Sequence, residues 1–210
     1  MCENKLIYKN LQYSQFEGIG KYNIPQIKGT SRTDVKELVG FNYAKTTKDT
    51  TEKGIHFFLD DYQFLRVWRT PDTYIPILKR FDFVLSPDFS LYIDFPVAMQ
   101  IYNHYRKHWL AAYWESQGIE VIPTICWSDK NSFEWCFDGE PVGGTLAVSS
   151  VGTQNSKRTK EMFLDGYSEM IKRLSPETII FYGDVPKECR GNILKIEAFQ
   201  EKFKKCRVDM

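Results

Sequence analysis

Short apolar runs alternate with longer segments of helical spacing through most of this chain of 210 residues. This alternation is typical of βα units that are arranged around a parallel sheet. Two of the runs, Val121–Ile122 and Ile179–Phe181, are apolar at every position, as expected of strands that are covered on both faces. The pattern therefore predicts an α/β fold with a mainly parallel sheet.

The sequence predicts about six strands, which is too few for a complete eight-stranded barrel. Two architectures stay open: a partial or irregular TIM-like barrel, or an open doubly wound sheet. The expected strands are residues 37–43, 55–59, 83–85, 121–125, 145–148 and 178–182. The expected helical segments are residues 62–68, 74–81, 94–118, 132–137, 156–174 and 193–205.

A single domain covering residues 1–210 is expected, because no repeat of fixed period and no low-complexity linker divides the sequence. Residues 1–34 lack a regular hydrophobic period and contain glycines and a proline that favour turns. We expect this segment to form an extended N-terminal arm beside the α/β domain.

The composition excludes a strongly basic protein, since 28 Lys and Arg face 27 Asp and Glu. This balance argues against a broad nucleic-acid-binding surface but leaves a local basic patch open. Five cysteines form no CxxC pair and are expected to be reduced. No apolar run approaches the roughly 20 residues that cross a bilayer, and no signal peptide pattern is present. The sequence predicts a soluble, cytoplasmic protein with no membrane partner.

Polar clusters follow the predicted strands, and they are Leu59–Asp61, Leu85–Ser90, Ile125–Asp129, Ser149–Gly152 and Tyr182–Asp184. The carboxyl ends of parallel strands open on one side of a sheet, so we expect these clusters to converge. Asp60, Asp88 and Asp129 are the candidate catalytic acids, and they are also candidate ligands for Mg²⁺ or Mn²⁺. The alternative is that each Asp caps a helix or a turn. Asp94 is expected to cap the helix over 94–118 in this way.

Four residues are candidates for ligand binding. Arg106 shares one helical face with aromatic rings and can hold a phosphate or a carboxylate, although an Arg extended along the helix is the structural alternative. Trp127 follows a predicted strand, and its indole ring can stack on a planar group of a ligand. Ser149 and Gly152 precede a predicted helix, where free N–H groups suit an anion. An ordinary turn between strand and helix is the alternative for this last pair.

His104 and His108 stand four residues apart on one predicted helix and can share a metal ion in principle. However, Tyr105 occupies the position at which the zinc-hydrolase pattern has Glu. The sequence therefore disfavours a metal site at these histidines. The basic segment from Lys187 to Arg207 is expected to be a solvated helix face, with contact to a nucleic acid backbone as the alternative.

Several separated stretches carry motifs: His56–Phe64, Leu85–Ser90, Tyr105–Arg106 with Trp109–Trp114, Val121–Thr124 with Trp127, and Phe163–Leu174 leading into Tyr182–Gly183. Together they resemble a family of unknown function that is found in bacterial genomes, phages and other mobile elements. The likeness spans about residues 30–183. It implies an accessory protein of the phage or prophage type and assigns no catalytic role to any residue.

The leading hypothesis is a protein that binds a polar or phosphate-bearing ligand at the strand ends, with metal-assisted catalysis as one version of it. A non-enzymatic protein that blocks or sequesters a host or phage factor is the first alternative. A DNA-associated replication or recombination accessory protein is the second. No motif in the sequence decides whether the chain is an enzyme.

Overall fold

The computed structural model describes residues 15–198, and a strand lies in or overlaps each of the six predicted ranges. Residues 41–43, which are predicted as strand, instead belong to a short helix, so that part of the prediction is wrong. The observed bounds of the strands are β3 (Glu37–Gly40), β4 (Lys53–His56), β5 (Phe83–Leu85), β6 (Val121–Ile122), β7 (Thr145–Ser149) and β8 (Thr178–Tyr182). A further strand, β9 (Ile193–Ile196), stands where a helix over 193–205 is predicted, so that prediction is wrong in its described part. Pairing with β8 overrides the local helical preference, since β9 lies beside it in parallel.

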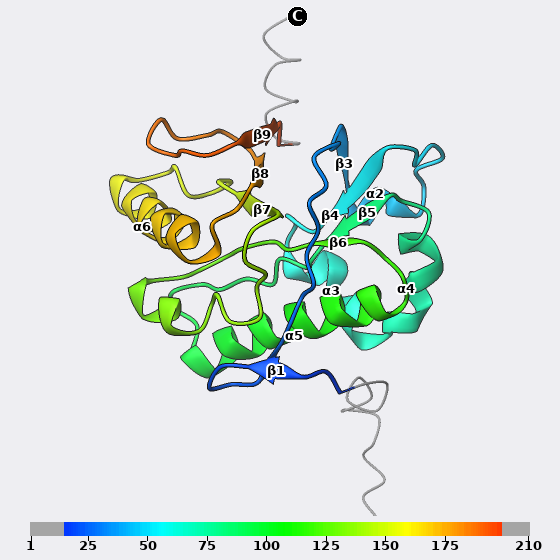
Figure 1. The fold of residues 1–210 in the computed structure, drawn as a ribbon, viewed down its shortest axis with the longest axis horizontal. Coiled ribbons are helices and arrows are strands. Elements are labelled where there is room, and N and C mark those ends of the chain that lie inside the picture. The colour runs from blue at the N-terminus through cyan, green and yellow to red at the C-terminus, as the bar shows by residue number, and fades with distance from the viewer. Residues whose placement is uncertain (1–14, 199–210) are drawn as a thin grey trace, which may run out of the picture.

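The strands form two parallel sheets, with the orders β3-β4-β5-β6 and β7-β8-β9 (Figure 1). A parallel bridge between Thr124 and Ala147 connects them. There the Ala147 N–H donates to the Pro123 carbonyl at 2.8 Å. The prediction of a parallel α/β fold is confirmed, but the strands divide between two sheets and residues 15–198 contain no closed barrel. Within each sheet the strands follow chain order, without the reversal that defines a doubly wound sheet.

The helices between the strands are α2 (Phe41–Ala44), α3 (Asp61–Arg69), α4 (Pro71–Leu78), α5 (Val97–Ser116), the 3-10 helix η2 (Lys130–Glu134) and α6 (Lys157–Leu174). Pro96, and not Asp94, occupies the N-cap position of α5, so the predicted cap is wrong. The predicted helix over 156–174 is confirmed as α6, and the Ser156 hydroxyl caps it by accepting from the Thr159 N–H. Within residues 15–198, no helix is both long and apolar enough to cross a membrane.

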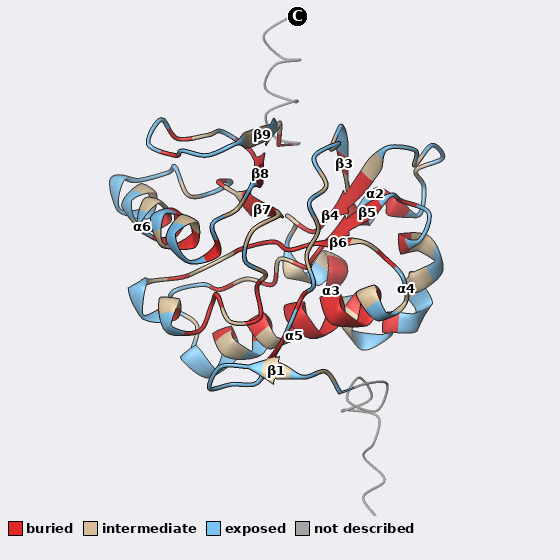
Figure 2. Ribbon diagram, in the orientation of Figure 1, coloured by how far each residue is buried: buried red, intermediate tan, exposed pale blue. Residues whose placement is uncertain are grey.

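Alternate side chains of the strands enter two different hydrophobic clusters. On β5, Val84 joins the outer cluster under the helices, where Trp109 and Trp114 of α5 are fully buried. Phe83 and Leu85 point to the opposite face and join an inner cluster that includes residues of β7 and β8. Figure 2 shows this buried centre, in red, between the exposed outer faces of the helices. Both faces of β5 are therefore covered.

The described part of the predicted N-terminal arm packs against the body of the molecule. It contains the hairpin β1 (Gly18–Ile19) and β2 (Ile24–Pro25), which lies beside α5 in Figure 1. The chain then crosses to β3, and on the way Arg32 pairs with Glu120 at 2.7 Å. The arm is thus tied to the domain by specific polar contacts in its described residues.

Gly54 of β4 provides a test of the packing between neighbouring strands. A Cβ at this position would lie 2.1 Å from the ring of Phe83, which is fully buried. We expect Gly54→Ala to lower the free energy of unfolding by about 1–3 kcal/mol, because the core has no room for the added methyl group. Urea denaturation measures this loss.

The double variant Gly54→Ala/Phe83→Leu removes the ring that the methyl group meets. Its loss of stability should be smaller than the sum of the losses of the two single variants. Strictly additive losses would contradict the proposed overlap between these two positions.

Candidate functional site

A pocket of about 930 Å³ opens at the carboxyl ends of the parallel strands. Residues from both sheets line it, among them Gly40, His56, Asp88, Cys126, Ser149 and Tyr182. Each of these stands at the end of a strand or in the loop that follows one. The volume lies in the range of pockets that hold small molecules. The strand-end clusters therefore contribute to one concave surface, as parallel strands require.

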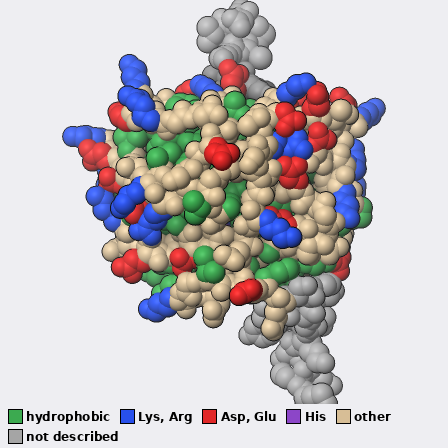
Figure 3. Space-filling model, in the orientation of Figure 1, with side chains coloured by type: hydrophobic (Ala, Val, Ile, Leu, Met, Phe, Trp, Pro, Cys, Tyr) green, Lys and Arg blue, Asp and Glu red, His purple; other side chains and the backbone are tan. Residues whose placement is uncertain are grey.

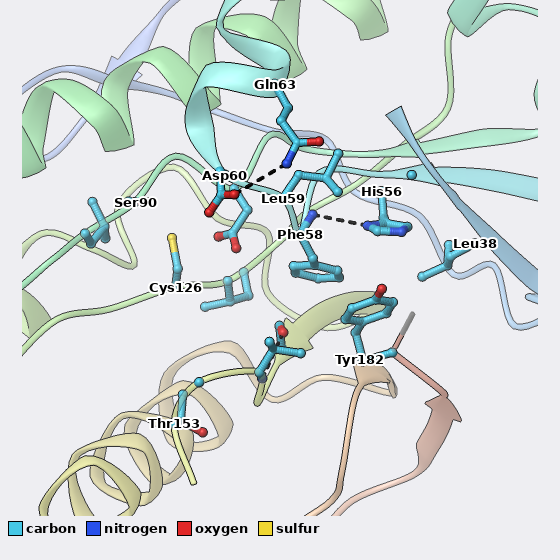
Figure 4. A pocket seen from close by; sticks show the side chains of 18 of the residues that line it. Leu38, His56, Phe58, Leu59, Asp60, Gln63, Ser90, Cys126, Thr153 and Tyr182 are labelled. Atoms are coloured by element: carbon cyan, nitrogen blue, oxygen red, sulfur yellow. Dashed lines mark hydrogen bonds between the residues drawn. The ribbon is translucent and has the colours of Figure 1, made fainter. Parts of the chain in front are cut away.

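Three aromatic side chains form one side of the pocket, and we call them the ring group: His56, Phe58 and Tyr182. The sequence analysis did not predict that they lie together. Phe58 stacks on Tyr182 with ring centroids 4.9 Å apart, and His56 lies 4.7 Å from Tyr182 (Figure 4). The Phe58 N–H donates to His56 Nδ1 at 3.2 Å, which leaves the proton of a neutral imidazole on Nε2. The period of two between His56 and Phe58 is the signal that places both on one face of an extended segment.

Asp88 is half-buried in the pocket wall and has a perturbed carboxyl group. Burial raises its pKa to about 6, with a further rise from Asp61. The positive charge of Lys107 and a hydrogen bond from the Cys126 thiol oppose this rise. A carboxyl group with a pKa near 6 can donate or accept a proton near neutral pH.

Asp60 reaches the same pocket from the start of α3. It occupies the N-cap position of α3 but makes no side-chain capping bond, and its nearest described donor is Gln63 Nε2 at 3.5 Å. In Figure 4 both side chains lie above the ring group. The next residue, Asp61, instead accepts the Ser90 hydroxyl at 2.8 Å and holds the loop after β5. Asp60 and Asp88 are thus the predicted acids that line the pocket.

Trp127, Ser149 and Gly152 also line the pocket. The Trp127 indole packs directly on α6, where a Cβ at Gly166 would lie 2.1 Å from its Nε1 atom. Ser149 and Gly152 do not stand at a helix N-terminus, because α6 begins only at Lys157. They precede this helix by several residues, as the sequence predicted, and both line the cavity, so anion binding at this segment stays a prediction.

Two predicted site residues, Arg106 and Asp129, lie outside the lining of this pocket. The Arg106 guanidinium stacks on the ring of Phe89 at 3.9 Å and donates to Asn103 Oδ1. The Asp129 carboxylate caps η2 by accepting the Ser132 N–H at 3.2 Å. Arg106 is engaged by Phe89 and Asn103, and Asp129 has the capping role that sequence analysis gave as its alternative.

The three candidate acids do not converge on one metal-sized site. In the described part of the chain, the set of three or more potential ligand residues whose donor atoms lie within 4.8 Å of one another is His104, His108 and Glu140. Among described lining residues the pocket carries four carboxylates, Glu37, Asp60, Asp88 and Glu197, and one lysine. That lysine, Lys53, pairs with Glu37 at 3.1 Å. The lining is therefore predominantly acidic.

A family model described as "Domain of unknown function (DUF4417)" matches residues 16–200. The Gene 1 protein of Mycobacterium phage L5 is 40% identical over 172 residues, which cover 81% of this chain and 75% of that protein. The Gene 1 protein of Mycobacterium phage D29 is 39% identical over 170 residues, or 80% of this chain and 63% of that protein. No solved structure matches the chain. The resemblance to a phage-associated family of unknown function is confirmed.

The raised pKa of Asp88 makes stability depend on pH. The native carboxyl group binds its proton more tightly than the unfolded chain does, so the free energy of unfolding falls as pH rises from about 4 to about 6. We expect Asp88→Asn to remove about 1–3 kcal/mol of this fall, a range that allows for the part of the side chain that faces the open pocket.

Urea denaturation between pH 4 and pH 7 measures the dependence. Asp129→Asn is the matched control, because this carboxylate lies outside the pocket, and its pH profile should keep the fall. A profile of Asp88→Asn that overlays the wild-type profile would contradict the assignment of the titration to Asp88.

Proposed function

The chain belongs to the DUF4417 family of domains of unknown function, and we propose that it binds a small polar ligand with a planar ring at the carboxyl ends of its strands. The observation that carries this proposal is the meeting of a ring group with Asp60 and Asp88 in one pocket of about 930 Å³. Two relatives are mycobacteriophage proteins. We therefore propose a phage-type accessory role for this binding.

The ring group supports a planar ligand. Phe58 is half-buried, and buried His56 and Tyr182 stand behind it and hold it in place. A ring that is fixed by its neighbours loses little conformational entropy when a second ring stacks on it. Trp127 adds a second half-buried ring to the lining. These rings supply stacking area, while the acids and Gln63 supply hydrogen-bonding groups.

The charge of the lining favours a neutral or cationic ligand over a phosphate-bearing one. Asp60 and Asp88 repel an anion, Lys53 is engaged by Glu37, and Arg106 stacks on Phe89 instead of entering the pocket. We assign Asp88 the role of a hydrogen-bonding group that donates below about pH 6 and accepts above it. In this proposal the ligand contacts Asp88 without a bound metal ion.

We also infer that the two sheets are parts of a partial TIM-like barrel. Support comes from the inner cluster, in which Phe83 and Leu85 of one sheet pack with Ala147 and Ile180 of the other. Barrels of parallel strands bind ligands at the carboxyl ends of the strands. The position of the pocket agrees with that arrangement.

Saturation-transfer difference NMR with adenosine, cytidine and their 5′-monophosphates tests the ligand class. The paired probes share a ring and differ in a phosphate group. We expect the nucleosides to bind and the monophosphates to bind about tenfold more weakly or worse, because the lining is acidic. Phe58→Ala should weaken nucleoside binding by about 10- to 100-fold through lost stacking.

The variant Asp60→Asn/Asp88→Asn should reduce the difference between nucleoside and monophosphate, whereas Asp129→Asn should leave it unchanged. Monophosphates that bind as tightly as nucleosides would contradict the proposed role of the acids. Absence of binding by all four probes, or binding that survives Phe58→Ala unchanged, would contradict the proposed ring-bearing ligand.

A non-enzymatic interaction protein is the second candidate, and one observation favours it. Large apolar side chains at the end of the loop after β5 and at the start of α5 are 49–57% exposed, and they are Tyr92, Ile93, Val97, Met99 and Tyr102. Exposed apolar side chains of this kind can contact another protein. Binding of a protein partner that Asp88→Asn leaves intact would favour this function.

The DNA-associated alternative receives less support. Its basic segment runs from Lys187 to Arg207, and residues 199–207 lie outside the described residues. In the described part, Lys195 pairs with Asp184 at 2.8 Å. On the face in Figure 3, basic and acidic side chains are interspersed.

A further inference from the structure

A second cluster of functional side chains is buried beside α5 and lies outside the pocket lining. His104 and His108 occupy successive turns of this helix, with ring centroids 4.4 Å apart. Glu140 reaches them from the turn that follows η2. The potential ligand atoms of the three residues lie within 4.8 Å of one another. The side chains of His108 and Glu140 are 0% exposed, and His104 is 1% exposed, so solvent does not compete with a bound ion.

Backbone carbonyl groups orient both imidazoles. His104 Nε2 lies 3.0 Å from the Asp138 carbonyl, and His108 Nδ1 lies 2.8 Å from the Pro25 carbonyl. A carbonyl oxygen can only accept, so His104 Nε2 donates and Nδ1 of the neutral ring keeps a lone pair. His108 has a second acceptor, because its Nε2 lies 3.0 Å from Glu140 Oε1, and a neutral imidazole can donate to only one of the two. A metal ion on His108 Nε2 leaves the proton on Nδ1 for the Pro25 carbonyl, which is the kind of contact that orients metal-binding histidines.

The cluster contains more hydrogen-bond acceptors than donors. His104 Nδ1 and Glu140 Oε2 are buried without a hydrogen-bond partner in the described residues. His108 Nε2 lies 3.0 Å from Glu140 Oε1, an oxygen that already accepts a hydrogen bond from Lys107. Buried lone pairs that face one another without a donor are costly. A positive centre among them removes that cost.

We propose that His104 Nδ1, His108 Nε2 and Glu140 bind a divalent transition metal ion of the Zn²⁺ class. Two imidazoles and one carboxylate are a ligand set that zinc uses, at about 2.0–2.2 Å from each ligand atom. Lys107 contacts Oε1 of Glu140 and leaves Oε2 free to face the ion. Calcium and magnesium prefer oxygen ligands and do not suit this set.

The ion has a structural role in this proposal. It joins α5 to the turn that holds Glu140, and through the His108 contact it also orders the strand β2. The backbone passes very close here, since a Cβ at Gly139 would lie 2.5 Å from the Pro25 carbonyl and 2.7 Å from His108 Nδ1. The site is independent of the proposed ligand in the pocket, and either can fail without the other.

Zinc titration of the full chain, after treatment with a chelator, tests the proposal. We expect one Zn²⁺ ion per chain, and we expect His104→Gln and His108→Gln to weaken binding by at least about 10- to 100-fold. The chain contains three histidines in all. His56→Gln is therefore the matched control, and it should keep the wild-type stoichiometry and affinity.

A measurement on the wild-type protein keeps the test valid where a variant fails to fold. Long-range ¹H–¹⁵N spectra resolve the three imidazoles, and added Zn²⁺ should shift Nδ1 of His104 and Nε2 of His108 while the His56 nitrogens stay unchanged. Absence of zinc binding at micromolar concentration, as expected of a cluster that holds only water, would overturn the proposal. Zinc-dependent shifts confined to His56 would overturn it as well.

Discussion

The pocket depends on the packing of two parallel sheets through their inner faces. Hydrogen bonds around the bridge between Thr124 and Ala147 bring the edges of β6 and β7 together, and the inner cluster fills the space behind them. This contact carries the ends of β4 and β8 toward each other, so that Phe58 and Tyr182 can stack. Weakening the inner cluster would separate the two halves of the ring group and open the site.

The helix α5 supports the other side of the fold through buried polar contacts. Twelve of its residues are buried, and they include Lys107, which donates to the Thr124 carbonyl at 2.9 Å and to Glu140. The charge of Lys107 also lowers the pKa of Asp88 against the effect of burial. One buried ammonium group thus connects the bridge between the sheets, the histidine cluster and the acid in the pocket. Removal of its carboxylate partner would leave an uncompensated buried charge, which is strongly destabilising.

The sequence predicted the strands and helices well where a local hydrophobic pattern specifies them. It predicted them less well where pairing with a distant strand determines the secondary structure. The strands β3 to β8 follow from apolar runs, and the start of α6 follows from its helical pattern. Ile193–Ile196 lies at the start of a segment predicted as a helix, and instead it pairs in parallel with the edge of β8. Of the predicted acids, Asp60 and Asp88 reach the pocket, while Asp129 satisfies the N–H groups of its own turn.

The sequence by itself determined the alternation of strands and helices and the convergence of strand ends, since both follow from local hydrophobic periods and from the direction of parallel strands. Only the tertiary structure decided which side chains face one another. Arg106 turns to Phe89 and away from the cavity, and Glu140 joins two histidines that precede it by more than thirty residues. These choices depend on contacts between segments that are far apart in the chain, and no local pattern encodes them.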